Sequence, residues 1–337
     1  MLSSYLKNIP EKVHRKLLNI FDRLIVQNIK IKAQNENKSW KDKKIFIENG
    51  LDKVLIPLSQ RKASDATLSV GRGTRIKIRL EDTLRLFVYW KQKEFRTDLD
   101  LSLIRFDEDL NLLGQVSYTN LQDGKIVHSG DIQSAEFGAS EFIDIDFSAI
   151  LDLVGDRNEY KTFFAKVNHK IFLKKGEKLE NATRYLAPQI YRFAGEEFDE
   201  ITCYSGWMIR KDTSSEFKTF DAKTVQNKFD VNGKGSYILP FVVDLYEEEI
   251  IFVDLFINAL NSQNRVEGAY KDISTVIGEV IKMSENKPNI KDLAIYNTKA
   301  LDGIITTNRD EADIVFGLYE GDYNFSYNVE KILNELI

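Results

Sequence analysis

Alternating apolar and polar residues dominate the middle of the chain. The pattern is clearest in residues 75–80 (RIKIRL), 98–103 (DLDLSL) and 141–147 (EFIDIDF), where every second side chain is apolar. Because successive side chains of a strand point to opposite faces, this period of two predicts half-buried strands. Residues 84–90 are almost continuously apolar, which predicts a central strand. Further strands are expected at 54–58, 113–118, 161–168, 200–210, 223–231, 237–245 and 249–256.

The number and spacing of these segments indicate the fold class. About ten short strands separated by turn residues are typical of an antiparallel β-sandwich and argue against a parallel α/β fold. The stretch 174–190 has no strong period, which predicts a long surface loop. We therefore expect a mainly β protein with flanking helices, α+β as a whole.

Both ends of the chain have helical periodicity instead. In residues 11–31, the apolar side chains of Val13, Leu17, Ile20, Phe21 and Leu24 lie close to helical spacing. The polar run at 33–43, after this helix, is expected to be a linker. The C-terminal region is expected to contain helices at 266–284, 288–301 and 327–337, with a short strand at 312–318. The expected parts are an N-terminal helical segment and linker (1–69), the β-sandwich (70–258) and a C-terminal helical and α/β appendage (259–337).

The apolar stripe from Val13 to Leu24 has two interpretations. It packs on the body of the protein, as most such stripes do, or it is an exposed surface for a partner. The second interpretation predicts that removal of residues 1–32 leaves the sandwich folded but alters self-association, as expected of a homo-oligomer.

Composition limits the function classes. The chain of 337 residues has 47 basic and 52 acidic residues and a net charge of −5, without a basic block. This argues against nucleic-acid binding, which needs clustered Lys and Arg. No run of about 18 apolar residues is present, so no membrane span is expected. The N-terminal sequence lacks the apolar core of a signal peptide, and the single cysteine, Cys203, fits a reducing compartment. A cytoplasmic protein is expected.

Common catalytic motifs are absent from the sequence. Residues 71–75 (GRGTR) lack the remaining residues of a dinucleotide or phosphate loop. The histidines His14, His128 and His169 are far apart and form no metal-binding pair in sequence. Cys203 lies in an apolar strand, which favours a buried, inert thiol, although a Cys–His pair formed in space stays possible.

An acidic group around residues 98–141 is the strongest candidate site. Asp98 and Asp100 are two apart on a strand, so their carboxylates point the same way and lie roughly 6–7 Å apart. Asp131, Glu136 and Glu141 follow in the next loop and strand. Together these oxygens are suited to a hard cation such as calcium, which takes about six to eight oxygen ligands. The alternative is that the acids form a solvated rim or pair with Arg96 and Arg105.

Three motifs in this region resemble a known family. Asp98-Leu-Asp100-Leu-Ser102, His128-Ser-Gly-Asp131 and Glu141-Phe-Ile-Asp-Ile-Asp-Phe-Ser148 are similar to the TerD family of tellurite-resistance and stress-response proteins. The similarity covers roughly residues 70–258, and the phrases around 55–64 and 72–75 resemble a larger TerD-like group. The resemblance implies a calcium-binding β-sandwich.

One departure from the family pattern changes the expected affinity. The family's calcium loop is rich in Asp and Gly, whereas this chain has Ile132, Ala139 and Ser140 at oxygen-rich positions. Glu136 is a possible substitute ligand. We therefore expect calcium to bind weakly, if at all, with an affinity of roughly 10⁻⁴–10⁻³ M.

Two functions follow from these observations. The first is a non-enzymatic, cytoplasmic stress-response protein of the tellurite-resistance type, acting through protein partners among other stress or defence components or through weak calcium binding. The alternative is a hydrolase that uses the acidic cleft around Asp98, Asp100 and His128.

Overall fold

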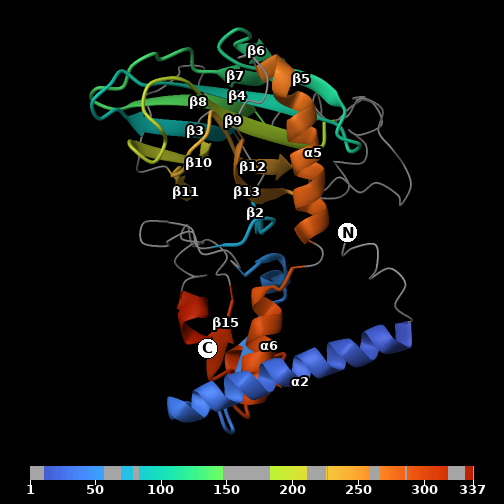
Figure 1. Cartoon of the computed structure of the whole chain (residues 1–337). Helices are drawn as coiled ribbons and strands as arrows, with labels where there is room; N and C mark the ends of the chain where they lie inside the picture. The colour runs from blue at the N-terminus through green and yellow to red at the C-terminus, as the bar shows by residue number, and fades with distance from the viewer. Residues whose placement is uncertain are drawn as a thin grey trace. The chain divides into compact units, whose positions relative to one another are not determined.

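The computed structural model describes most of the chain as two compact units. The described residues are 11–56, 70–78, 83–146, 183–210, 225, 227–257, 266–284, 287–317 and 331–336. One unit comprises Met1–Ile56 and Pro288–Ile337, and the other comprises Pro57–Lys287 (Figure 1). The strand expected at 161–168 lies outside the described residues.

The larger unit contains two six-stranded sheets whose strands are antiparallel. The first sheet has the order β11 (Asn227–Asp230), β10 (Thr202–Arg210), β3 (Thr83–Lys91), β8 (Ala139–Asp146), β7 (Ile126–His128) and β6 (Gln122–Asp123). The second has the order β2 (Arg75–Lys77), β13 (Glu249–Ile257), β12 (Tyr237–Asp244), β9 (Tyr185–Ala194), β4 (Asp98–Phe106) and β5 (Leu112–Val116). The expected mainly β character is confirmed.

Aromatic side chains join the two sheets. The ring of Trp207 on β10 lies 5.2 Å from that of Phe241 on β12, and the ring of Phe229 on β11 lies 5.6 Å from that of Phe252 on β13. All four rings are buried. Offset and edge-on ring contacts of this kind are favourable between packed layers. The sheets therefore pack as a sandwich, and Trp207 is a core residue.

The prediction of a surface loop at 174–190 is wrong over its last residues. β9 is a central strand between β12 and β4. Most of its side chains are buried, so its sequence does not alternate. It also contains Pro188, which cannot donate a ladder hydrogen bond. The β9–β12 ladder is irregular between Ile238 and Val243, the stretch that contains Pro240 and lies opposite Pro188. The two prolines thus occupy the interrupted part of the ladder.

A helix covers part of the second sheet. Ile273 and Ile277 of α5 (Val266–Ser284) pack in one cluster with Ile104 and Phe106 of β4 and Leu239 of β12. The expected parts were 1–69, 70–258 and 259–337. The contacts instead divide the chain after Ile56 and after Lys287, because the apolar face of α5 is buried on the sandwich.

The smaller unit combines segments from both ends of the chain. β1 (Lys44–Ile47) pairs in parallel with β14 (Ile304–Thr306) on one side and β15 (Ile314–Phe316) on the other. The unit also contains α2 (Glu11–Asn35), η1 (Asn49–Lys53), α6 (Ile290–Ala300) and η4 (Arg309–Glu311). Residues 331–335 are helical too, within the helix expected at 327–337. Residues 33–43, expected to be a linker, contain the end of α2 and a buried Trp40 whose ring lies 5.7 Å from that of Phe316.

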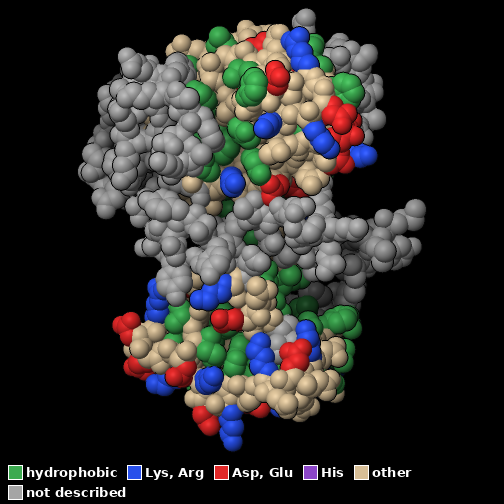
Figure 2. Space-filling view, turned by 90° about the vertical axis from the view of Figure 1, so that its left-hand side faces the viewer, with side chains coloured by type: hydrophobic (Ala, Val, Ile, Leu, Met, Phe, Trp, Pro, Cys, Tyr) green, Lys and Arg blue, Asp and Glu red, His purple; other side chains and the backbone are tan. Residues whose placement is uncertain are grey.

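The visible surface mixes both signs of charge. Figure 2 shows Lys and Arg side chains interspersed with Asp and Glu on the described part of one face. This agrees with the small net charge of −5. Among the helices of the described residues, none is long and apolar enough to cross a membrane.

Candidate metal centre

The candidate site lies where β4, which is paired with β9 on one side, lacks a neighbouring strand on the other side. The β5 ladder reaches only as far as Leu103 on β4, paired with Val116. Beyond it, the N–H of Leu101 donates to Glu141 Oε2 at 2.8 Å, and the carbonyl oxygen of Leu101 lies 2.8 Å from His128 Nε2. Side chains from the other sheet therefore satisfy the backbone groups that a longer β5 would pair.

The contacts of His128 define its protonation. The N–H of Gly130 donates to His128 Nδ1 at 3.0 Å, so Nδ1 is the acceptor and Nε2 carries the proton that is donated to Leu101. Burial lowers the pKa of His128, which keeps the ring neutral. Both ring nitrogens are thus used by the backbone, and His128 holds the loop that follows it.

Glu141 fixes the same loop from the other side. Its Oε1 accepts a hydrogen bond from the N–H of Ile132 at 2.8 Å, while Oε2 accepts from Leu101. Burial raises the pKa of Glu141 to about 8, although the two N–H groups oppose the shift. The side chain is fully buried. Glu141 therefore connects β4 to the loop instead of pointing an unpaired oxygen at a ligand.

The loop between β7 and β8 has a defined path. Gly130 and Gly138 have φ values of 107° and 93°, in the left-handed region that favours glycine. The guanidinium of Arg96, which precedes β4, donates to the carbonyl oxygen and the side-chain oxygen of Gln133 at 2.9 and 2.8 Å. These contacts bring Asp131 to the edge of β4.

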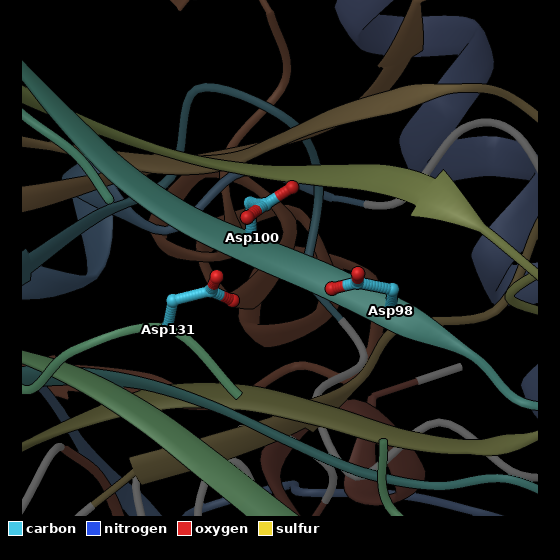
Figure 3. A group of neighbouring side chains, drawn as sticks. All are labelled: Asp98, Asp100 and Asp131. Carbon is cyan, nitrogen blue, oxygen red and sulfur yellow. The ribbon is translucent and has the colours of Figure 1, made fainter. Parts of the chain in front are cut away.

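Asp98, Asp100 and Asp131 converge at this edge. Each offers a carboxylate oxygen, and the three oxygens lie within 4.8 Å of one another (Figure 3). Asp98 and Asp100 are buried, whereas Asp131 is exposed. Burial raises the pKa of Asp100 to about 7, and the neighbouring Asp98 and Asp131 add to the shift. Burial and Asp131 also raise the pKa of Asp98, against the opposing effect of Arg96.

Buried polar atoms without a hydrogen-bond partner in the described structure lie at and near the three aspartates. Asp98 Oδ1 is buried and has no hydrogen-bond partner in the described structure, and the same holds for Ser102 Oγ and the side-chain amide of Gln189. Ser102 pairs with Gln189 across β4 and β9, and by strand alternation it lies on the same face as Asp100. Buried polar atoms normally have partners. This donor set therefore fits a hard, hydrated cation, which binds carboxylate oxygens directly and further polar groups through water.

The other predicted site residues occupy different positions. Glu136 is exposed and lies outside the group of three, as does the buried Glu141. Arg105 pairs with Asp123 at 2.7 Å, not with the acidic group.

Sequence reasoning missed two residues of this surface. Ser102 continues the alternation of Asp98 and Asp100, and that signal was available in the sequence. Gln189 had no signal, because it lies in a segment that lacks periodicity and was expected to be a loop.

The single cysteine, Cys203, does not have the exposed, polar surroundings of a reactive thiol. Cys203 on β10 is buried, and burial raises the pKa of its thiol above the ordinary value. This confirms the expected buried position and makes a reactive thiolate unfavourable. The side chain of His14 and the whole of His169 lie outside the described residues.

Comparisons with known proteins add no relative. Neither the protein-family models, nor the curated proteins, nor the solved structures contain a match to this chain. The resemblance to the TerD family rests on the sequence motifs alone, including the phrases around 55–64 and 72–75, and stays a prediction.

Proposed function

We propose that this chain is a non-enzymatic, TerD-like stress-response protein whose sandwich binds calcium through Asp98, Asp100 and Asp131. The observation that carries the proposal is the convergence of three carboxylate oxygens within 4.8 Å of one another, one from each residue, two of the residues being buried. The unpartnered Oδ1 of Asp98 supports it, because a bound cation would satisfy that oxygen.

Electrostatics favour a cation at this position. The pKa of Asp100 is raised to about 7, so at neutral pH the full negative charge of the group is held only at a cost in free energy. A divalent cation removes that cost by placing positive charge among the oxygens. Protonation of Asp100 also lowers the negative charge of the group and so competes with cation binding. Cation binding is therefore expected to weaken as the pH falls.

The geometry favours calcium over magnesium. Asp131 lies on a loop and is exposed, so the oxygen set can adapt to the irregular, larger coordination sphere of calcium. Magnesium demands a near-ideal octahedron at shorter distances. A site in which three carboxylates bind calcium and water completes its coordination sphere is expected to bind weakly, with an affinity of roughly 10⁻⁴–10⁻³ M.

The loops beside the group supply a surface for protein partners. Phe95 precedes β4 and is 66% exposed, and Phe137 follows Asp131 in its loop and is 88% exposed. The hydrogen bonds from Arg96 to Gln133 link these two loops. Exposed aromatic side chains are typical anchors of protein interfaces. In this proposal the cation orders the loops that present Phe95 and Phe137 to a stress or defence component.

A hydrolase is the second candidate, favoured by one observation. A carboxyl group with a pKa of about 7, as for Asp100, is suited to general acid catalysis near neutral pH. His128 does not contribute to it, because its ring is buried and both nitrogens contact the backbone. Turnover of a hydrolase substrate panel that is lost in Asp100→Asn would favour the enzyme over the binding protein.

Titration calorimetry of the chelator-treated protein with calcium and with magnesium tests the proposal. The wild type is expected to bind calcium at one site with an affinity of roughly 10⁻⁴–10⁻³ M, and magnesium more weakly. Asp100→Asn is expected to lose at least about tenfold in calcium affinity, equivalent to roughly 1.4 kcal/mol. Glu136→Gln, which removes an exposed carboxylate from the same loop, is the matched control and is expected to bind like the wild type. Equal calcium binding by all three proteins would contradict the proposal.

A further inference from the structure

Helix α2 carries a row of exposed apolar side chains. Their exposed fractions are 45% for Val13, 39% for Leu17, 52% for Ile20, 49% for Leu24 and 50% for Ile31. Isolated exposed apolar residues are ordinary, but a continuous row along one helix marks an interaction surface.

The row has the spacing of a coiled-coil seam. Positions 13, 17, 20, 24, 27 and 31 follow one another at intervals of four and three, as the d and a positions of a heptad do. Gln27 is the single polar residue among them. A polar residue at one core position is a known device for fixing the register of paired helices.

The opposite side of α2 is already packed within its own unit. Ile29 and Ala33 are buried, and Asp22 accepts a hydrogen bond from the hydroxyl of Tyr296 on α6 at 2.7 Å. These residues fall at the c and f positions of the same heptads, away from the seam. In Figure 1, α2 extends well past α6 at its N-terminal end. The helix is thus held by one face while its seam stays without a partner in the described structure.

We propose that the seam of α2 pairs with the same seam of a second copy of this chain, as a parallel two-stranded coiled coil. Charge decides the orientation. Lys16, Arg23 and Lys30 occupy the g positions, whereas the e positions hold the uncharged Phe21 and Asn28. A parallel pair places each g cation beside an uncharged e residue of the other copy. An antiparallel pair places g beside g, so that the cations would repel one another.

A lipid surface is the rival occupant, since α2 is amphipathic and carries basic residues. A helix that lies in a membrane surface buries its apolar face in the lipid. Its polar face carries cations, which border the apolar face at both edges. Here the basic g row runs along one edge only. The other edge leads to Leu18 and Ile25, which are exposed and apolar, and has a cation at this heptad position only at Lys32, in the last turn of the helix. This one-sided pattern favours a helical protein partner.

Mass measurement by sedimentation equilibrium tests the pairing. At concentrations of about 1–100 µM, where a micromolar dimer associates, the wild type is expected to approach twice its mass of 38.9 kDa. Leu24→Glu introduces a charge into the seam and is expected to be monomeric throughout this range. Leu18→Glu is the matched control, because Leu18 is similarly exposed at 48% but lies off the seam. It is expected to dimerise like the wild type, with both variants unchanged in circular dichroism.

Cross-linking tests the orientation. In a parallel pair the two copies of position 27 face each other, so Gln27→Cys is expected to form a disulfide-linked dimer under mild oxidation. The wild type, whose only cysteine is the buried Cys203, is not expected to do so. A monomeric wild type over the whole concentration range would overturn the proposal. Sedimentation of a monomeric wild type with anionic vesicles would overturn it in favour of the lipid surface.

Discussion

At the residue scale, the acidic side chains of the β4 edge have two different roles. Glu141 accepts hydrogen bonds through both oxygens from Leu101 and Ile132, and so holds two backbone segments together. Asp98 and Asp100 converge with Asp131 on a common point instead. The two N–H donors offset part of the cost of burying Glu141, whereas the clustered carboxylates of the aspartates repel one another unless a cation is present.

The first prediction concerns Asp100 and pH. The folded-state pKa of about 7 lies above the ordinary 3.8, so the protonated group stabilises the fold fully at low pH, and this contribution is lost as the pH rises towards 7. In chelator at about pH 7.5, Asp100→Asn is therefore expected to be more stable than the wild type by roughly 1–3 kcal/mol, and the gain shrinks below about pH 4. Urea unfolding at both pH values measures the difference. A variant less stable at the higher pH would contradict this account.

The second prediction concerns Glu141. Glu141→Gln keeps the side-chain shape but replaces one acceptor oxygen by an N–H₂ group that faces the N–H of Leu101 or Ile132. A buried N–H without an acceptor costs about 1–3 kcal/mol of unfolding free energy, which urea unfolding detects. Glu136→Gln, exposed in the same loop, should change stability by no more than about 0.5 kcal/mol. Equal effects of the two substitutions would show that the Glu141 contacts contribute little.

At the element scale, strands could be predicted from the sequence where they alternate, as β4 does, or are continuously apolar, as β3 is, whereas β9 has neither pattern. β4 alternates because its two faces carry different side chains, and the strand expected at 98–103 is confirmed as part of β4, which extends to Phe106. β9 is buried on both faces and contains Pro188, so neither alternation nor strand propensity signals it. The strand that places Gln189 beside Ser102 was therefore missed, and part of the candidate site with it.

The third prediction concerns α5, whose helical period was visible in the sequence but whose packing was not. Ile277→Ala leaves a cavity between α5 and the second sheet and is expected to lower the unfolding free energy by about 2–4 kcal/mol. Asp272→Ala, on the exposed side of the same helix, is expected to cost no more than about 0.5 kcal/mol. Tryptophan fluorescence reports on the sandwich through the buried Trp90 and Trp207, and the variant Trp40→Phe removes the signal of the smaller unit. An Ile277→Ala variant with an unchanged transition would mean that α5 is an independent appendage.

At the scale of the whole molecule, sequence order is a poor guide to the division of the chain. β1 lies between two strands that follow it by more than 250 residues, with Lys44 beside Ile304 and Ile47 beside Phe316. Pairing between such distant segments leaves no local pattern, so the N- and C-terminal regions were expected to be separate. The sandwich could be predicted as a fold class, because its strands have alternating or continuously apolar patterns in many cases. Its pairings could not be predicted, because β3 pairs with β8 and β10, and β4 with β9, which are not neighbours in sequence.

The central claim is that Asp98, Asp100 and Asp131 bind a cation, and the melting temperature with and without calcium tests it most directly. A site of roughly 0.3 mM affinity gains only about 0.9 kcal/mol of stability in about 1 mM calcium. The wild type is therefore expected to melt about 1–2 °C higher in calcium than in chelator, while Asp100→Asn melts at the same temperature in both. A wild type that does not respond to calcium, or an Asp100→Asn variant that responds as the wild type does, would contradict the account.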